Sequence, residues 1–366
     1  MGIKLKDLVI KRNLDISQLK GNIIAIDAPN IIMGLFNFVR RNPDGSRADF
    51  ILDRTQRPIS HLYGLLYRLS FYYSKDILPI FCFDGRDSDL KKKRTKNLLN
   101  DFRATEKYYQ DAISSGNKNL ARKIALSKEY LWHNIIKESK ELLDAFGVPH
   151  IESPASAESQ CAQLVKDKIA RYSNSQDYDS LLFGCPDIIM NLSKSLRRKV
   201  RGHWTYQKIV PKTMNLKENL YYLEIDLFQL IDLAILVGND YFPGIKKIGP
   251  KSALKLVKIH KNLENILKRE KLNYDFTSLT PEITAKVRKI FLFPDVITKY
   301  PLFSWNPPNE AKIVQLLCEE HYLNRERIMN NLKKLSSNFK TCRLNFIEQE
   351  RHPRTFQKTI DSILYE

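Results

Sequence analysis

Two apolar runs in the first quarter of the chain predict buried parallel strands. They are NIIAID at 22–27 and ILPIFCFDG at 77–85, both rich in Ile or Phe and both with an aspartate at the end. Between them, SHLYGLLYRLSFYYS at 60–74 repeats Leu and Tyr at helical spacing. The order strand, helix, strand predicts an α/β fold with a right-handed crossover. Ligands of such sheets bind beyond the carboxyl ends of the strands, where Asp27 and Asp84 fall.

Charge replaces this apolar pattern between residues 87 and 133. The segment DLKKKRTKNLLNDFRATEKYYQDA is basic and helix-prone, SSGNKN at 114–119 interrupts it, and a second helix is expected afterwards. We expect a charged helical insertion over the sheet, and the alternative is a solvated surface hairpin. The position of the segment directly after Asp84 favours a functional role.

The pattern then returns to a helix and a strand. KESKELLDAFGVPHIESP predicts a helix that stops at Gly147 and a short strand behind it. Ser153 and Pro154 predict the N-cap and first turn of the next helix, which passes Glu158 and ends near Ala170.

The second half of the chain is mainly helical. QDYDSLLFG at 176–184 places two aspartates just before what we expect to be another apolar strand. Further on, an apolar helix ends at Gly238, Asp240 follows, and two glycines flank a basic turn before the next helix. The chain is expected to be helical up to about residue 340, and RHPRTFQKTIDSILYE is expected to be a disordered arm that ends in a short motif.

Composition narrows the class of protein. The 366 residues are 43% hydrophobic, which is ample for a full core, and the formal charge of +19 favours a polyanionic partner, most often nucleic acid. A merely basic soluble protein or one that meets anionic membranes are the alternatives. The five cysteines form no CxxC pair, which argues against a disulfide framework or a zinc cluster and for a reducing interior. The charged N-terminus does not resemble a signal peptide, and no apolar run is long enough to span a membrane.

Six acidic residues stand out because each lies at a strand end or a helix start. They are Asp27, Asp84, Glu158, Asp177, Asp179 and Asp240. One acid after a strand is usually just a turn residue, but converging carboxylates raise one another's pKa and need cations. Mg²⁺ prefers oxygen ligands, and two such ions about 3.5–4 Å apart are the usual apparatus of phosphodiester cleavage. The set therefore predicts a two-metal site.

The order of motifs resembles the flap endonucleases of the structure-specific 5′ nuclease superfamily, the archaeal branch most closely. The matching segments cover essentially the whole chain: MGI, IAIDAPN, HLYGLLYRL with PIFCFDG, SQDYDSLLFG, LAILVGNDY with GIKKIGPKSAL, and LLCEEHYLNRERI. The resemblance implies an α/β, PIN-like fold: a central, twisted, mostly parallel sheet flanked by helices, with a helical arch and a helix-two-turn-helix motif.

The same resemblance implies a domain plan. We expect a single nuclease domain over 1–340 and a flexible tail over 345–366. The parts expected within the domain are an N-terminal region at 1–100, the arch at about 87–133, an internal nuclease region at about 134–260 and the helix-two-turn-helix at about 226–262.

The family's site residues carry over position by position. The six acids would hold two Mg²⁺ ions, or Mn²⁺, directly or through water, and Lys91 would contact the scissile phosphate. The positions that match DNA-binding residues are Gly2, Arg40, Arg68, Lys91, Arg94, Gly238, Gly249 and Lys251. The family also binds a monovalent cation in the helix-two-turn-helix, which implies K⁺ there. For the glycines, ordinary helix capping is the alternative.

The implied substrate is branched DNA with a displaced 5′ single strand. The implied activity is that of an endo- and exodeoxyribonuclease that acts on Okazaki fragments and on base-excision flaps. In the tail, Gln357, Thr359 and Ile360 match the opening of the family's sliding-clamp motif, and Ile363 and Leu364 stand where its aromatics belong. A frayed terminal helix is the alternative for this tail. We expect a monomer without a membrane partner, located at the nucleoid in an archaeon or in the nucleus of a eukaryote.

Three substitutions depart from the family pattern. Ser156 stands where the family has a metal-ligand acid, Met33 where it has a base-stacking tyrosine, and Leu98 where it has an arch arginine, a role that Arg94 or Arg103 could take over. They leave three hypotheses open: an active flap endonuclease with a thinner metal shell, a weakened paralogue that binds branched DNA, or a relative that prefers Holliday junctions or bubbles.

Overall fold

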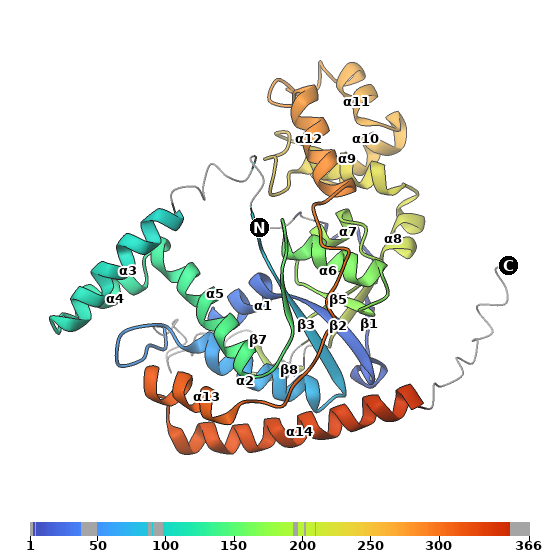
Figure 1. Ribbon diagram of the computed structural model, residues 1–366. Helices are drawn as coiled ribbons and strands as arrows, with labels where there is room; N and C mark the ends of the chain where they lie inside the picture. The colour runs from blue at the N-terminus through green and yellow to red at the C-terminus, as the bar shows by residue number, and fades with distance from the viewer. Residues whose placement is uncertain are drawn as a thin grey trace.

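A mixed seven-stranded sheet forms the centre of the molecule in the computed structural model (Figure 1), which describes residues 3, 5–37, 50–86, 90, 98–192, 197–200, 203–208 and 210–351. The strand order is β1-β9-β6-β5-β2-β3-β4. The strands are β1 Arg12–Asn13, β2 Asn22–Asp27, β3 Ile77–Phe83, β4 His150–Glu152, β5 Tyr172–Asn174, β6 Asp187–Met190 and β9 Lys212–Asn215.

The five strands from β6 to β4 are parallel, which confirms the α/β prediction. β2 pairs with β3 in a register that sets Asp27 opposite Cys82, and β2 also pairs with β5. β9 and β1 extend the sheet antiparallel beyond β6. Since the carboxyl ends of parallel strands share one edge, the acids that follow β2, β3 and β5 are brought to the same side.

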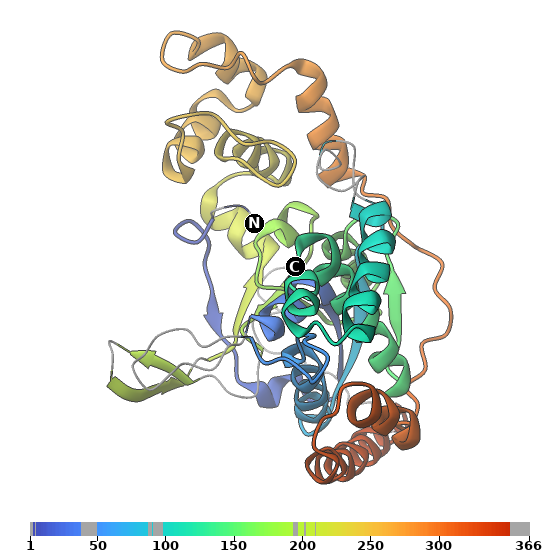
Figure 2. The ribbon, with the colours of Figure 1, turned by 90° about the vertical axis from the view of Figure 1, so that its left-hand side faces the viewer.

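Helices cover the sheet and extend beyond it at two places. They are α1 Ala28–Phe36, α2 Ser60–Tyr73, α3 Leu98–Ser114, α4 Lys118–Ala125, α5 Lys128–Ala145, α6 Ala157–Lys166, α7 Asp179–Leu182, α8 Leu216–Leu223, α9 Leu227–Val237, α10 Pro250–His260, α11 Leu263–Arg269, α12 Pro281–Leu292, α13 Glu310–Val314, the π-helical η3 Gln315–Glu320 and α14 Arg325–Arg351, with a 3₁₀ turn at Ile16–Leu19. In Figure 1, α3 and α4 extend to one side, α9 to α12 gather at one end, and α14 lies along the opposite end. The ribbon of β7 (Arg197–Val200) and β8 (His203–Lys208) projects from the body (Figure 2).

The main core lies between the sheet and its helices, and the insertion has a small core of its own. Strand β3 is buried along its whole length, and Leu65, Leu66 and Leu69 of α2 are fully buried against the sheet side. The separate core joins α3, α4 and α5 through residues that share near-complete burial: Tyr109, Ala112, Ala121, Ala125 and Tyr130. The insertion is therefore a packed helical unit and not a solvated hairpin.

Two sequence predictions about local structure were wrong. Helix α6 begins at Ala157 and is capped by the Ser156 hydroxyl, because the carbonyls of Pro154 and Ala155 accept from the N–H groups of Arg86 and Gly85 beside the sheet and not from a helical turn. The run after Asp177 is the short helix α7 and not a strand. Periodicity cannot separate a buried strand from a buried helical turn in so short an apolar run.

The helical boundaries also differ from those expected. The insertion contains three helices where two were predicted, because the second is divided between α4 and α5 at residues 126–127. Helix α5 then continues without a break through the boundary at residue 133. Helix α14 runs to Arg351, so residues 345 to 351 are helical and not part of a flexible tail. No helix in the described residues is long and apolar enough to cross a membrane.

Candidate active site

The six acids singled out in the sequence line one cavity of about 270 Å³ at the carboxyl edge of the parallel strands. Asp27 ends β2 and Asp84 follows β3, while Glu158 lies in the first turn of α6. Asp177 precedes α7, Asp179 begins it, and Asp240 follows α9. The remaining lining comes from Pro29, Asn30, Met33, Trp132, Ser156, Phe183 and Tyr241. None of the described residues that line the cavity is basic.

Asp27 is held from two sides. One carboxylate oxygen accepts from the Asn30 N–H at 3.3 Å, which caps α1, and the other accepts from the Ser175 hydroxyl at 2.8 Å. Asn30 in turn donates through its amide to Asp177 at 2.9 Å. Both orienting residues were missed in the sequence, although Asn30 ends the motif IAIDAPN and Ser175 opens SQDYD. Short polar residues beside a ligand acid were the available signal.

Backbone donors fix two further acids. Asp84 accepts from the Ala157 N–H at 2.8 Å, so it is tied to the first turn of α6. Asp179 accepts from the Ile3 N–H at 2.8 Å, which brings the start of the chain to the cavity. Since these carboxylates are oriented by the main chain, their positions follow from the fold itself.

The surroundings of the cavity disfavour the charged form of the acids that line it. Burial, and then the charge of Asp84, raises the pKa of Asp27 to about 7. Burial raises the pKa of Asp179 to about 7, and Asp240 adds to the effect against the lowering by the Ile3 N–H. Burial and then Asp27 raise the pKa of Glu158 well above its usual range. Bound cations would favour the charged form of these carboxylates and so offset the cost of burying them together.

The donor set fits hard divalent ions. All candidate ligands are carboxylate oxygens, the chemistry preferred by Mg²⁺ and Mn²⁺. Among the described residues, no three His, Cys, Asp or Glu side chains lie close enough together to hold a metal ion in their present positions. Mg²⁺ typically keeps several waters and takes only one or two protein carboxylates, so an open arrangement of this kind suits it.

Ser156 lines the cavity but its hydroxyl already has a structural task. It accepts from the Ser159 N–H at 3.2 Å as the N-cap of α6, and the Ser159 hydroxyl donates to the Ser156 carbonyl at 2.8 Å. Glu158 lies two residues later on the same turn. The position that the family pattern gives to an acid is therefore occupied by a neutral capping group.

The predicted DNA-binding positions have different outcomes. Gly238 ends α9 at a φ of 103°, where an added Cβ would meet the Pro243 carbonyl at 2.6 Å, so this turn requires glycine. Gly249 caps α10, and Lys251 is exposed in its first turn. Arg68 is half-buried and donates to the Leu192 carbonyl, which gives it a structural contact. Their roles on DNA stay predictions.

Several other predicted residues lie outside the described part of the chain. These are Gly2, Arg40, Lys91 and Arg94, predicted to act on DNA, and Gln357, Thr359, Ile360, Ile363 and Leu364, predicted to act in clamp binding. Trp132 of α5 also lines the cavity, although it was not among the predicted site residues.

The family models and the relatives of similar sequence indicate the same protein family. Residues 1–102 match the XPG N-terminal domain and residues 147–240 match the XPG I-region. The chain is 39% identical over 341 residues to flap endonuclease 1 of Staphylothermus marinus, covering 92% of this chain and 94% of the relative. It is 34% identical to flap endonuclease 1 of Methanosarcina acetivorans, with 92% of this chain and 96% of the relative covered.

Solved structures agree with this assignment. Flap endonuclease-1 from Methanococcus jannaschii superposes with a TM-score of 0.70 at 27% identity, over 93% of this chain and 99% of that chain. The catalytic core of Rad2 in complex with DNA substrate superposes with a TM-score of 0.63 at 23% identity, over 89% and 96% of the two chains, and this likeness supports the PIN-like nuclease fold.

Proposed function

Since this chain belongs to the flap endonuclease family, we propose that its six-carboxylate cavity binds two divalent metal ions, Mg²⁺ or Mn²⁺, and cleaves DNA there. The chain is a structure-specific 5′ flap endonuclease of DNA replication and repair, and the nucleases of this family are metal-dependent hydrolases of phosphodiester bonds. The observation that carries the proposal is the convergence of six acids from separate elements on one cavity.

The protein's own part in the reaction is to bind the metal ions and to position the DNA substrate. Bound divalent ions would supply an activated water and stabilise the charge that develops on the phosphate. Asp27, Glu158 and Asp179 would hold these ions, and their raised pKa values support this because a cation would favour their charged forms. Asn30 and Ser175 keep Asp177 and Asp27 oriented through the hydrogen bonds described above.

Because Ser156 stands where a metal-ligand acid is expected, we propose that the nuclease activity of this chain is reduced. A neutral hydroxyl is a poor ligand beside carboxylates, and this one is committed to capping α6. One ion would therefore have a water in place of a protein ligand. The same observation favours a second candidate function, a weakened paralogue that binds branched DNA and cuts it slowly.

The remaining roles rest on position and charge. The turn between α9 and α10 presents exposed Lys246, Lys247 and Lys251 beside backbone N–H groups, which suits phosphate, and K⁺ would bind its carbonyls. Lys91 would contact the scissile phosphate, with Gly2, Arg40, Arg68 and Arg94 as DNA contacts. The tail would bind the sliding clamp through Gln357, Ile360, Ile363 and Leu364, and the protein would act as a monomer at the nucleoid or in the nucleus.

A metal titration of flap cleavage tests the proposal. Wild type and Asp179→Asn are compared on a 5′-flap DNA over a range of Mg²⁺ concentrations. Asparagine keeps an acceptor for the Ile3 N–H but loses the charge, so cleavage is expected from wild type alone. Equal cleavage rates of wild type and Asp179→Asn at every Mg²⁺ concentration would contradict the role of Asp179 and the proposal that the cavity cleaves DNA. Strong binding without cleavage by wild type would favour the second candidate.

A further inference from the structure

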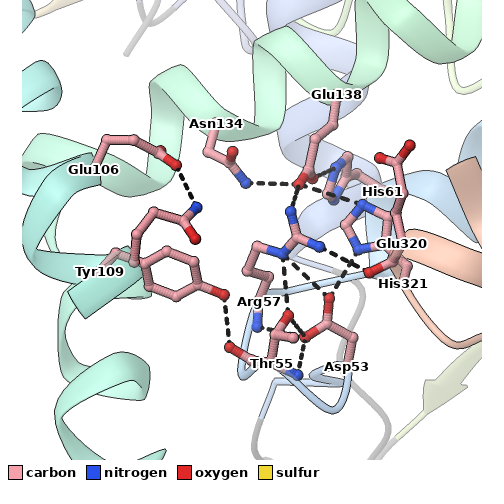
Figure 3. A network of polar contacts seen from close by, with 11 residues as sticks. Asp53, Thr55, Arg57, His61, Glu106, Tyr109, Asn134, Glu138, Glu320 and His321 are labelled. Carbon is pink, nitrogen blue, oxygen red and sulfur yellow. Dashed lines mark hydrogen bonds and ion pairs between the residues drawn. The ribbon is translucent and has the colours of Figure 1, made fainter. Parts of the chain in front are cut away.

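A buried polar cluster lies beside the arch helices and outside the catalytic cavity (Figure 3). We define this cluster as the Arg57 cluster, made of Asp53, Thr55, Arg57, His61, Tyr109, Asn134, Glu138, Glu320 and His321. These residues come from five segments: the turn before α2, the first turn of α2, α3, α5, and the end of η3. Elements far apart in the sequence therefore meet at one guanidinium.

The turn that carries Arg57 is organised by Asp53. One Asp53 oxygen accepts from the Thr55 N–H at 2.8 Å, the Thr55 hydroxyl at 2.7 Å and the Arg57 N–H at 2.9 Å. Its other oxygen lies 2.8 Å from His321 Nδ1 and accepts from Arg57 Nε at 3.3 Å. The turn is thereby closed on itself and fixed to the segment that precedes α14.

Glu138 connects α5 to the same cluster. Its carboxylate accepts from the Asn134 amide at 2.8 Å and from Arg57 Nη1 at 3.4 Å, and it lies 3.0 Å from His61 Nε2. His321 Nε2 is 3.4 Å away. Glu138 is 7% exposed and His61 is fully buried, so these contacts are made away from bulk water, where their geometry is strongly constrained.

Two more contacts complete the connection. Arg57 Nη2 donates to the Glu320 carbonyl at 2.9 Å, and the Tyr109 hydroxyl of α3 donates to the Thr55 carbonyl at 2.7 Å. The Tyr109 ring stacks on Tyr130 of α5 with centroids 5.1 Å apart. The Arg57 cluster thus holds both long helices of the insertion against the body of the protein.

Helix α5 spans the distance between this cluster and the catalytic cavity. Trp132 lines the cavity, and Glu138 lies six residues further along the same helix, a rise of about 9 Å. A rotation or shift of α5 at Glu138 must therefore move Trp132 relative to the carboxylates. The cluster is not a metal site of its own, because the Arg57 guanidinium already fills the place between its carboxylates.

We propose that the Arg57 cluster is a positioning device for the nuclease reaction, which sets the place of α5 and Trp132 over the catalytic cavity. Arg57, Glu138 and His321 are positioning residues in this account and do not touch the substrate. The inference rests on the proposed function of the carboxylate cavity, since it assigns a catalytic consequence to a contact remote from the acids.

The test replaces Arg57 and measures both geometry and catalysis with Mg²⁺ present. Arg57→Met keeps a flexible, unbranched apolar side chain but removes the guanidinium and its charge, and Arg57→Lys keeps a charge that can reach fewer partners. We expect Arg57→Met to lower kcat on a 5′ flap about tenfold with KM nearly unchanged, since misplacement by about 1 Å can cost up to about 10²-fold. Arg57→Lys is expected to recover part of kcat.

Tryptophan fluorescence reports the geometry without requiring activity. The chain has three tryptophans, so the signal of Trp132 is the difference between each protein and its Trp132→Phe counterpart. We expect acrylamide to quench Trp132 more strongly in Arg57→Met than in wild type. Thermal unfolding of every variant shows whether it is folded at the assay temperature.

Asp76→Asn is the control for simple loss of a half-buried charge that has hydrogen-bond and ion-pair partners. Asp76 pairs with Lys20 at 3.3 Å and accepts from Asn345 at 2.9 Å, just before β3 and so at the other end of that strand from Asp84. Its kcat and Trp132 quenching are expected to equal those of wild type. If Arg57→Met is folded and also keeps both values, the positioning account is wrong. If wild type cleaves no flap, the proposed function is wrong. The comparison of Trp132 quenching between wild type and Arg57→Met then decides by itself whether the cluster positions α5.

Discussion

Two groups of buried carboxylates in this protein are in opposite electrostatic states. In the cavity lined by six acids, burial and then neighbouring acids raise the pKa of Asp27 and of Glu158. In the Arg57 cluster, burial alone would also raise the pKa of each acid, but hydrogen bonds from His321 and His61, together with Arg57, leave the pKa of Asp53 and of Glu138 below the usual value.

The difference separates carboxylates that serve binding from carboxylates that serve structure. An acid that is paired with cationic side chains keeps its charge without a metal ion, and removing one partner of such a buried pair destabilises the fold. An acid crowded by other acids destabilises the fold and can recover that energy only from a bound ion. The same residue type at similar burial therefore has opposite roles, and removing one acid from each group should have opposite consequences.

Asp27→Asn should give the largest effect and the clearest form of this contrast. Asparagine still accepts from the Asn30 N–H, so the cap of α1 remains. We expect flap cleavage to fall about 10³-fold, which is about 4 kcal/mol, while the free energy of unfolding in a chelator stays the same or rises. Kinetics and urea unfolding measure the two quantities. A variant that is both active and less stable would place Asp27 with the structural acids.

Glu138→Gln is the counterpart in the Arg57 cluster. It leaves Arg57 and two histidines around a neutral amide, and breaking a buried pair in this way typically costs about 3 kcal/mol. Urea unfolding with an unchanged m-value would record this loss, independent of added metal. A free energy of unfolding equal to that of wild type would show that the cluster contributes nothing to stability.

The pH dependence of that loss is the next smaller effect. Because the pKa of Glu138 is lower in the folded than in the unfolded chain, its stabilisation is present above the unfolded pKa of 4.5 and is lost as pH falls through the folded pKa. The difference in unfolding free energy between wild type and Glu138→Gln should therefore be constant near neutral pH and shrink below pH 4.5. A difference that grows on acidification would mean that the shift has the other sign.

Substitution of Ser156 should give the smallest change in the rate of flap cleavage. It adds an acid to the cavity directly. Ser156→Glu adds a carboxylate but loses the cap on the Ser159 N–H, whereas Ser156→Asp adds one and can keep the cap. We expect Ser156→Asp to raise flap cleavage about three- to tenfold at limiting Mg²⁺, or about 1 kcal/mol. Ser156→Ala controls for the cap. If neither acid changes the rate, the account of a missing ligand is wrong although the fold stands.

The sequence predicted well the strands and the acids that meet at the six-carboxylate cavity. Strands that are buried on both faces leave a continuous apolar signal, so β2, β3 and the acids behind them could be placed from the pattern alone. Parallel topology brings Asp27, Asp84 and Asp177 to one edge of the sheet, as the structure confirms. The other three acids reach the same cavity from α6, from α7 and from the segment after α9. Their joint role still depended on the resemblance to a known family.

The Arg57 cluster was not visible in the sequence. Asp53, Glu138 and His321 are separated by 85 and 183 residues and look like ordinary polar positions. Their partnership arises only when η3 packs beside α5, which no local pattern encodes. Likewise, the N-cap of α6 was misplaced because Ser153 and Ser156 are equally suitable in sequence. Only the bonds of the Pro154 and Ala155 carbonyls to the segment after β3 decide between them.

Binding of Mn²⁺ to the protein without DNA tests the central claim most directly. Titration followed by electron paramagnetic resonance counts the ions bound to wild type and to Asp179→Asn, with Glu138→Gln as a control from the Arg57 cluster. The account predicts two ions for wild type and for Glu138→Gln, and fewer for Asp179→Asn. No bound Mn²⁺, or the same number of ions in Asp179→Asn as in wild type, would contradict it.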